Sequence, residues 1–143
     1  MINRRITVTP ASALLVVAAL LACKSGGEKL PADVPVYPGA EEKTNMVTVG
    51  IHNVLHQTQA DGATVKAWYD TQLASAWKPR LVCGNSWRQR RKMLNTTFEN
   101  RCFKHTSRDE YLQIEVASTP GNLTSIRTRS CPGNRQDRCA GKP

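Results

Sequence analysis

The chain has 143 residues, a formal net charge of +9 and a hydrophobic fraction of 40%. This length fits one domain with its own buried core and excludes a multidomain arrangement. The charge favours anionic partners: lipid head groups, polyanionic envelope polymers or acidic proteins.

The first 22 residues have the composition of a secretory signal peptide. Arg4 and Arg5 precede an almost wholly apolar run over residues 11–22, and this order is the export pattern. As a helix the run would span about 18 Å, too short for a hydrocarbon core of roughly 30 Å. We therefore predict that residues 1–22 are removed on export. Nucleic acid, the usual partner of a basic chain, is then not expected as a partner.

The apolar run ends in Leu20-Leu21-Ala22-Cys23. This motif resembles the lipobox of bacterial lipoproteins. The resemblance implies cleavage after Ala22, diacylglycerol on the thiol of Cys23 and a membrane anchor. Lys24 follows in place of the aspartate that retains enteric lipoproteins at the inner membrane, which implies the outer membrane, facing the periplasm. The alternative is an ordinary cleaved signal followed by a free cysteine.

Setting Cys23 aside leaves an even set of cysteines, which are Cys83, Cys102, Cys131 and Cys139. In an oxidising compartment such a set predicts two disulfides, with three connectivities allowed. We favour Cys83–Cys102, joining neighbouring strands, and Cys131–Cys139, closing a loop with a proline–glycine turn. The alternative is zinc, but structural zinc sites use cysteine pairs about two to four residues apart, and no pair here is that close.

Residues 23–30 are predicted to be a lipidated tether, and residues 31–143 a single domain with a polar C-terminal loop. The domain opens with closely spaced prolines, which exclude a helix and favour extended structure. Pro38-Gly39 predicts a type II turn.

Residues 46–58 alternate between apolar and polar side chains, which predicts one half-buried strand. The side chains expected on its inner face are Val47, Val49, Ile51 and Leu55. His52 and His56 would lie on the exposed face, about 13 Å apart at the rise of a strand. That separation is too long for one metal ion to bridge.

A helix is predicted after residue 61, with Asp61 as its N-cap. Its apolar stripe at helical spacing comprises Val65, Trp68, Tyr69, Leu73 and Trp77. We expect this stripe to pack on a sheet as core. The alternative is that Trp68 and Tyr69 form a platform for a ligand.

Strand patterns return at residues 80–83, 96–105, 111–117 and 123–129. In the third of these, Leu112, Ile114 and Val116 are expected to face inward. The order of elements predicts an α+β domain with a mainly antiparallel sheet, one helix packed across it, and stabilising disulfides.

The segment Val34-Pro-Val-Tyr-Pro-Gly-Ala40, with the aromatic helix after it, is similar to the opening of small bacterial lipoprotein domains of uncharacterised function. The resemblance covers residues 30–77. It implies the same order of strand and helix, and it carries no catalytic residues with it.

The densest basic cluster comprises Arg88, Arg90, Arg91 and Lys92. It fits a solvated loop or hairpin tip, or alternatively a contact to phosphate or carboxylate groups, since arginine forks onto such oxyanions. Trp87 beside the cluster fits either insertion at an interface or packing under the sheet.

No catalytic motif of the G-x-S-x-G, H-E-x-x-H or phosphate-loop type occurs in the sequence. We therefore expect no catalytic residue, metal or cofactor. The leading hypothesis is a non-catalytic, lipid-anchored envelope protein that binds or scaffolds an anionic envelope component or an acidic protein through the basic cluster. The alternatives are an enzyme acting on envelope polymers, which needs a reactive cleft, and a small-ligand carrier, which needs an apolar pocket between helix and sheet.

Overall fold

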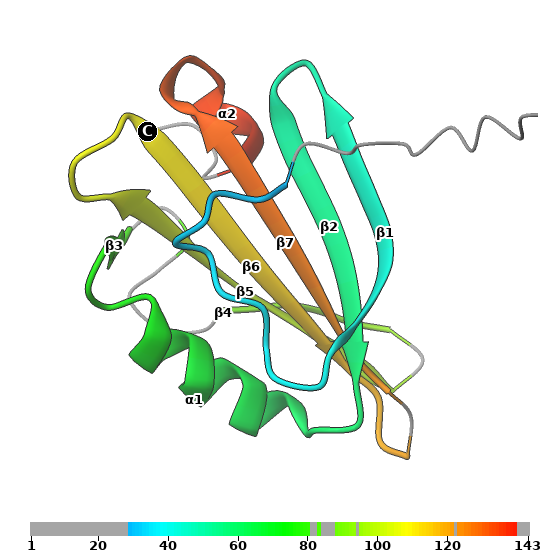
Figure 1. Cartoon of the computed structure of the whole chain (residues 1–143). Helices are drawn as coiled ribbons and strands as arrows, with labels where there is room; N and C mark the ends of the chain where they lie inside the picture. The colour runs from blue at the N-terminus through cyan, green and yellow to red at the C-terminus, as the bar shows by residue number, and fades with distance from the viewer. Residues whose placement is uncertain (1–28, 81–82, 84–87, 94, 122, 140–143) are drawn as a thin grey trace, which may run out of the picture.

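The computed structural model describes residues 29–80, 83, 88–93, 95–121 and 123–139, with the backbone alone for residues 88–93. They form one seven-stranded sheet in the order β1-β2-β7-β6-β5-β3, with β4 also paired to β5 (Figure 1). All six pairings are antiparallel. The predicted signal peptide and Cys23 lie outside the described residues.

As predicted, a helix lies between an N-terminal strand region and a longer run of strands. The strands are β1 (Glu41–Thr48), β2 (Ile51–Thr58), β3 (Trp77–Pro79), β4 (Arg88–Met93), β5 (Thr96–His105), β6 (Glu110–Ser118) and β7 (Thr124–Pro132). The helices are α1 (Gly62–Gln72), the 3-10 helix η1 (Gly133–Arg135) and α2 (Gln136–Cys139). The predicted α+β class, with an antiparallel sheet and a helix packed across it, is confirmed. Within the described residues, no helix has the length and apolarity needed to cross a bilayer.

The main core lies between α1 and one face of the sheet (Figure 1). Val65, Tyr69 and Leu73 of the helical stripe are buried there. Alternate residues of a strand point to the same face, and the inward residues predicted in β6 are buried in the same core: Leu112, Ile114 and Val116. The predicted packing of the stripe is therefore confirmed, while Trp68, half-buried, stacks edge-on against Tyr37.

Helix α1 begins and ends with local signals. The carboxylate of Asp61 accepts a hydrogen bond from the backbone N–H of Thr64 at 2.9 Å, which confirms the predicted N-cap. At Gly62 a Cβ atom would come within 1.9 Å of the Ser118 hydroxyl and 3.1 Å of its Cβ, so a larger residue would require Ser118 of β6 to shift. The helix stops at Gln72, and Trp77, predicted on the stripe, belongs to β3 but is still buried in the core.

The predicted single strand over residues 46–58 is wrong, because the segment is a hairpin of β1 and β2. Val49 and Gly50 form its turn, with φ of 52° and 75°. Two-residue hairpin turns of this kind normally use Asn-Gly or Asp-Gly; a valine here left the apolar alternation unbroken and hid the turn. The face of β2 that packs on the core is the one that carries Val54 and His56. His56, predicted to be exposed, is therefore only 4% exposed.

Strand β1 is a sheet edge, and its pairing with β2 shifts register between Glu42 and Thr44. The first three residues of β1 are all exposed and charged: Glu41, Glu42 and Lys43. This edge therefore combines charge with an irregular backbone.

Two regions differ from their predicted structure. The cluster from Arg88 to Lys92 lies on β4 and pairs with β5, instead of forming a loop or hairpin tip, because an edge strand can be held by backbone hydrogen bonds without an apolar face. The C-terminal segment, predicted as a polar loop, forms η1 and α2, and α2 folds back to bury Cys139. Its side chains are polar because most of them face solvent.

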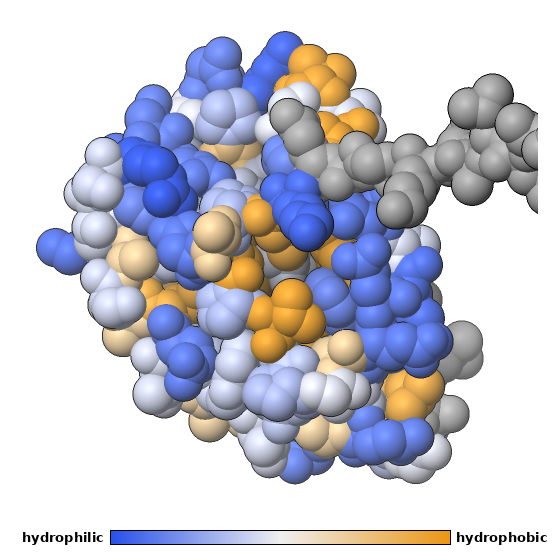
Figure 2. Space-filling model, in the orientation of Figure 1, coloured by the Kyte–Doolittle hydropathy of each residue, from blue (hydrophilic) through white to orange (hydrophobic). Residues whose placement is uncertain are grey.

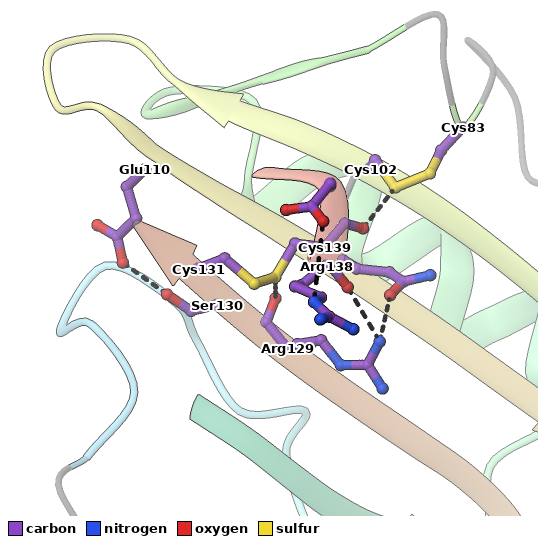
Figure 3. The surroundings of a disulfide bond; sticks show 10 residues. Cys83, Cys102, Glu110, Arg129, Ser130, Cys131, Arg138 and Cys139 are labelled. Carbon is purple, nitrogen blue, oxygen red and sulfur yellow. Dashed lines mark hydrogen bonds and ion pairs between the residues drawn. A yellow bond between two sulfur atoms is a disulfide. The ribbon is translucent and has the colours of Figure 1, made fainter. Parts of the chain in front are cut away.

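A second, smaller core lies on the sheet face opposite α1. It contains both disulfides, Cys83–Cys102 and Cys131–Cys139, with Cα–Cα distances of 5.1 and 5.9 Å, as predicted (Figure 3). Tyr111 of β6 is buried in the same cluster. The first bond fixes the connection between β3 and β4 to β5, and the second holds α2 against the end of β7.

Candidate functional site

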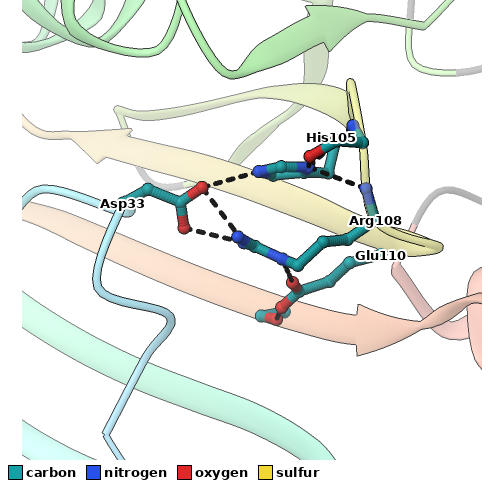
Figure 4. Close-up of polar contacts among 6 residues, drawn as sticks. Asp33, His105, Arg108 and Glu110 are labelled. Atoms are coloured by element: carbon teal, nitrogen blue, oxygen red, sulfur yellow. Dashed lines mark hydrogen bonds and ion pairs between the residues drawn. The ribbon is translucent and has the colours of Figure 1, made fainter.

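Polar side chains from three separate parts of the chain meet beside the β5–β6 turn (Figure 4). Asp33 accepts hydrogen bonds from His105 Nε2 at 2.7 Å and from Arg108 Nη2 at 2.8 and 3.0 Å. Glu110 accepts from Arg108 Nε at 3.0 Å and from the Ser130 hydroxyl at 2.6 Å. This cluster connects the N-terminal segment, β6 and β7.

The hydrogen bonds of His105 define its role. Its Nδ1 accepts the backbone N–H groups of Ser107 and Arg108 at 3.1 and 3.0 Å, so the neutral ring carries its proton on Nε2 and donates it to Asp33. A catalytic histidine must instead accept a proton from the nucleophile hydroxyl. The Ser107 hydroxyl faces Nδ1 at 3.4 Å, where two backbone donors already bind. The arrangement therefore fixes the turn and does not activate Ser107.

The charge state of Asp33 follows from the same contacts. Burial raises the pKa of Asp33, but hydrogen bonds from Arg108 and His105 outweigh burial, and the pKa lies below its ordinary value of 3.8. Asp33 is therefore a carboxylate at neutral pH and holds the N-terminal segment against the turn. Sequence patterns gave no signal for this cluster, because Asp33 and His105 are 72 residues apart.

A hollow of about 900 Å³ opens beside the first turn of α1. Its lining is mostly small and polar, and includes Asp61, Asn95, Thr97, Ser118 and Thr119. These side chains offer one carboxylate, that of Asp61, and neutral hydrogen-bonding groups, but no aromatic surface. Among the described residues, no group of three or more His, Cys, Asp or Glu side chains is placed to hold a metal ion.

The space where a carrier would need its pocket is filled. Tyr69, Leu73 and Trp77 occupy the interface between α1 and the sheet, and each is at most 1% exposed. Trp68 and Tyr69, considered as a ligand platform, pack on each other and on the N-terminal segment instead. These aromatic side chains act as core and as the cover of its rim.

A hollow of about 290 Å³ lies between the β1–β2 turn and α2, on the sheet face opposite α1. Apolar Met46 and Val49 line it together with Arg129, Arg135 and Arg138. We name these five residues the turn patch. Arg129 Nη1 donates to the backbone oxygen of Arg138 at 3.2 Å, which ties α2 to β7 (Figure 3).

The predicted basic cluster does not join the turn patch. The cluster lies on β4, beside β5, and comprises Arg88, Arg90, Arg91 and Lys92, whereas the patch lies at β1, the β1–β2 turn, β7, η1 and α2, toward the other edge of the sheet. The side chains of the cluster, like Trp87, lie outside the described part of the structure. The arginines of the turn patch were missed because they are scattered singly along the sequence.

The described residues define a small α+β domain with one antiparallel sheet, covered by a helix on one face and fastened by two disulfides on the other. No family model matches the chain, and neither does any curated protein or any solved structure.

Proposed function

We propose that this chain is an exported lipoprotein of the bacterial envelope, anchored through lipid on Cys23, and that its folded domain is a non-catalytic binding or scaffolding module. The observation that carries the proposal is the pairing of the other cysteines. Cys83 pairs with Cys102 and Cys131 with Cys139, so Cys23, at the end of the apolar run, is the one remaining thiol.

Two physical arguments support this assignment. Disulfides persist in oxidising compartments such as the periplasm, which agrees with an export signal before Cys23. Attachment of two or three acyl chains gives a stable anchor, whereas one chain gives only marginal binding. We propose the outer membrane, facing the periplasm, because Lys24 follows Cys23 in place of the aspartate that retains enteric lipoproteins at the inner membrane.

The anchor is tested by metabolic labelling with palmitate in a bacterial host. The wild-type chain should take up label and sediment with membranes, and the variant Cys23→Ser should do neither. The matched control is Cys131→Ala/Cys139→Ala, which removes thiols elsewhere and should keep the label. Equal labelling of Cys23→Ser would overturn the proposal.

The binding role is tested at the basic cluster. We propose that Arg88, Arg90, Arg91 and Lys92 contact an anionic envelope component or an acidic protein. Replacing them in pairs, Arg88→Ser/Arg90→Ser and Arg91→Ser/Lys92→Ser, should weaken salt-sensitive retention on envelope fractions. The control Lys78→Ser/Lys104→Ser removes the same charge from the adjoining β3–β5 pair and should retain binding. An equal loss in all three variants would reject this cluster as the contact.

A further inference from the structure

The turn patch combines exposed aliphatic side chains with arginines. Val49 is 70% exposed and Met46 56% exposed, the highest fractions among the large hydrophobic residues that the structure describes as exposed. Val49 lies in the β1–β2 turn, and Met46 lies on β1 three residues before it. Figure 2 shows hydrophobic surface beside hydrophilic residues at the end of the molecule where Figure 1 places this turn. Exposed aliphatic side chains that lie together beside polar residues are typical of a surface that contacts a membrane or another protein.

The backbone of Val49 adds a second, independent observation. Its φ of 52° places a β-branched residue in the left-handed region, where valine is a true outlier and asparagine or glycine is preferred. Strain of this kind persists at functional positions, where the side chain is needed despite its cost. The backbone strain at Val49 therefore supports a role for its aliphatic side chain at this turn.

On the α2 side of the turn the neighbouring charge is mostly positive, whereas Asp109 and Glu110 lie on its other side, near Gly50. Arg135 and Arg138 are exposed on η1 and α2, and Arg129 lies beside them on β7. Asp137 is the acid that faces Arg138, at 3.8 Å, and it is itself about half exposed. Aliphatic side chains that line one hollow with three arginines match an anionic phospholipid surface, which takes apolar groups below its head groups and attracts basic residues at their level.

The reach of the tether brings this end of the domain to the bilayer. Six residue steps separate Cys23 from Lys29, and a fully extended chain spans at most about 21 Å over that length. The described chain begins toward the end of the sheet that carries the β1–β2 turn and α2 (Figure 1). Asp33 is bound to His105 and Arg108 at that same end.

We propose that the turn patch is a membrane-contact surface that seats the domain on a bilayer containing anionic phospholipid, with Val49 and Met46 inserted and Arg129, Arg135 and Arg138 at the phosphates. The orientation argument rests on the proposed lipid anchor at Cys23. The affinity of the patch for the bilayer is a property of the folded domain alone, because both hydrophobic cores and both disulfides are formed by residues from Leu30 onward.

The test is co-sedimentation of the acyl-free protein, beginning at Lys24, with vesicles that contain phosphatidylglycerol and with vesicles of phosphatidylcholine alone. The protein should bind the anionic vesicles and be released by salt. Arg135→Ser and Arg138→Ser should each weaken binding roughly fivefold, and Val49→Asn by about as much. Asparagine suits the turn conformation, so this variant keeps the hairpin.

The matched controls lie at the opposite end of the sheet. Lys43→Ser removes one exposed charge from β1, and Leu123→Asn removes one exposed aliphatic group from the β6–β7 turn; both should bind like the wild type. Equal binding to both vesicle types, equal loss in the controls, or displacement by inorganic phosphate would each overturn the proposal. Bare Cys23 in the palmitate experiment, with vesicle binding intact, would reject the anchor and support the patch.

Discussion

Asp70 of α1 and Arg101 of β5 form an ion pair that joins the helix to the sheet. One turn earlier, Lys66 of the helix forms an equivalent pair with Glu99 of the same strand. In both strand residues the side chain points to the face that α1 covers, so the rim of the apolar core is closed by charge pairs.

We expect Asp70→Asn to lower the free energy of unfolding by about 0.5–1 kcal/mol, since the pair is partly exposed. A double-mutant cycle with Arg101→Met, measured by urea denaturation, should give a coupling energy of similar size. The exposed pair of Glu41 and Lys43 provides the control, and Glu41→Gln should change stability very little. A coupling energy of zero for Asp70 and Arg101 would contradict a stabilising role.

The two disulfides are expected to contribute unequally, because they close loops of 19 and 8 residues. Loop-closure entropy predicts that Cys83→Ala/Cys102→Ala lowers the free energy of unfolding by about 3 kcal/mol and Cys131→Ala/Cys139→Ala by about 2.5 kcal/mol. Denaturant unfolding of the oxidised proteins measures both values. Cys23→Ser should leave the free energy unchanged. Free thiols at any of the four paired positions in the oxidised protein would refute the pairing.

His56 should make stability depend on pH. Burial lowers the pKa of His56 below its ordinary value of 6.5, and the carboxylate of Glu42 opposes this only in part. Unfolded His56 therefore binds a proton at a higher pH than folded His56 does. The contribution of neutral His56 to the free energy of unfolding is fully present above about pH 6.5. It is lost as the pH falls from there through the lower pKa of the folded state.

Urea denaturation at several pH values between about 7.5 and 5 measures this slope. His56→Gln should flatten it, whereas the control His52→Gln should retain it. An unchanged slope in His56→Gln would contradict the assignment to His56.

Asp33 contributes to a separate acid transition, because its pKa lies below 3.8. The stabilisation by the Asp33 carboxylate is present at neutral pH and is lost as the pH falls through that lower range.

The β1–β2 turn should be easy to stabilise. A non-glycine residue in the left-handed region costs about 1–2 kcal/mol. This conformational cost is smaller for asparagine than for valine. We therefore expect Val49→Asn to raise the free energy of unfolding by about 1 kcal/mol, measured as a higher denaturation midpoint. A lower midpoint would show that Val49 makes contacts in the folded state that outweigh its backbone strain.

Periodicity predicted the central elements well because their side chains alternate against a single core. The predicted strand at residues 96–105 has the bounds of β5, and the helix after Asp61 packs through the stripe that its spacing indicated. Disulfide pairing was also predictable, since one pair joins neighbouring segments and the other closes a short loop of 8 residues.

The failures have physical causes. The β1–β2 turn uses Val49 in place of a turn-forming residue, so the sequence carries no punctuation there. Strand β4 is mostly basic, and it is held to β5 by backbone pairing, which leaves no apolar pattern in the sequence. The Asp33–His105 contact and the turn patch depend on long-range proximity, which local patterns do not encode.

The charged and irregular edge at β1 has a consequence for crowding. A straight, neutral edge strand presents free N–H and C=O groups that can template a neighbouring chain into a continuous sheet. Here the register shift between Glu42 and Thr44 and the flanking charges oppose such growth. Many copies can therefore be concentrated on one surface without this edge pairing with a neighbouring copy and starting a fibril.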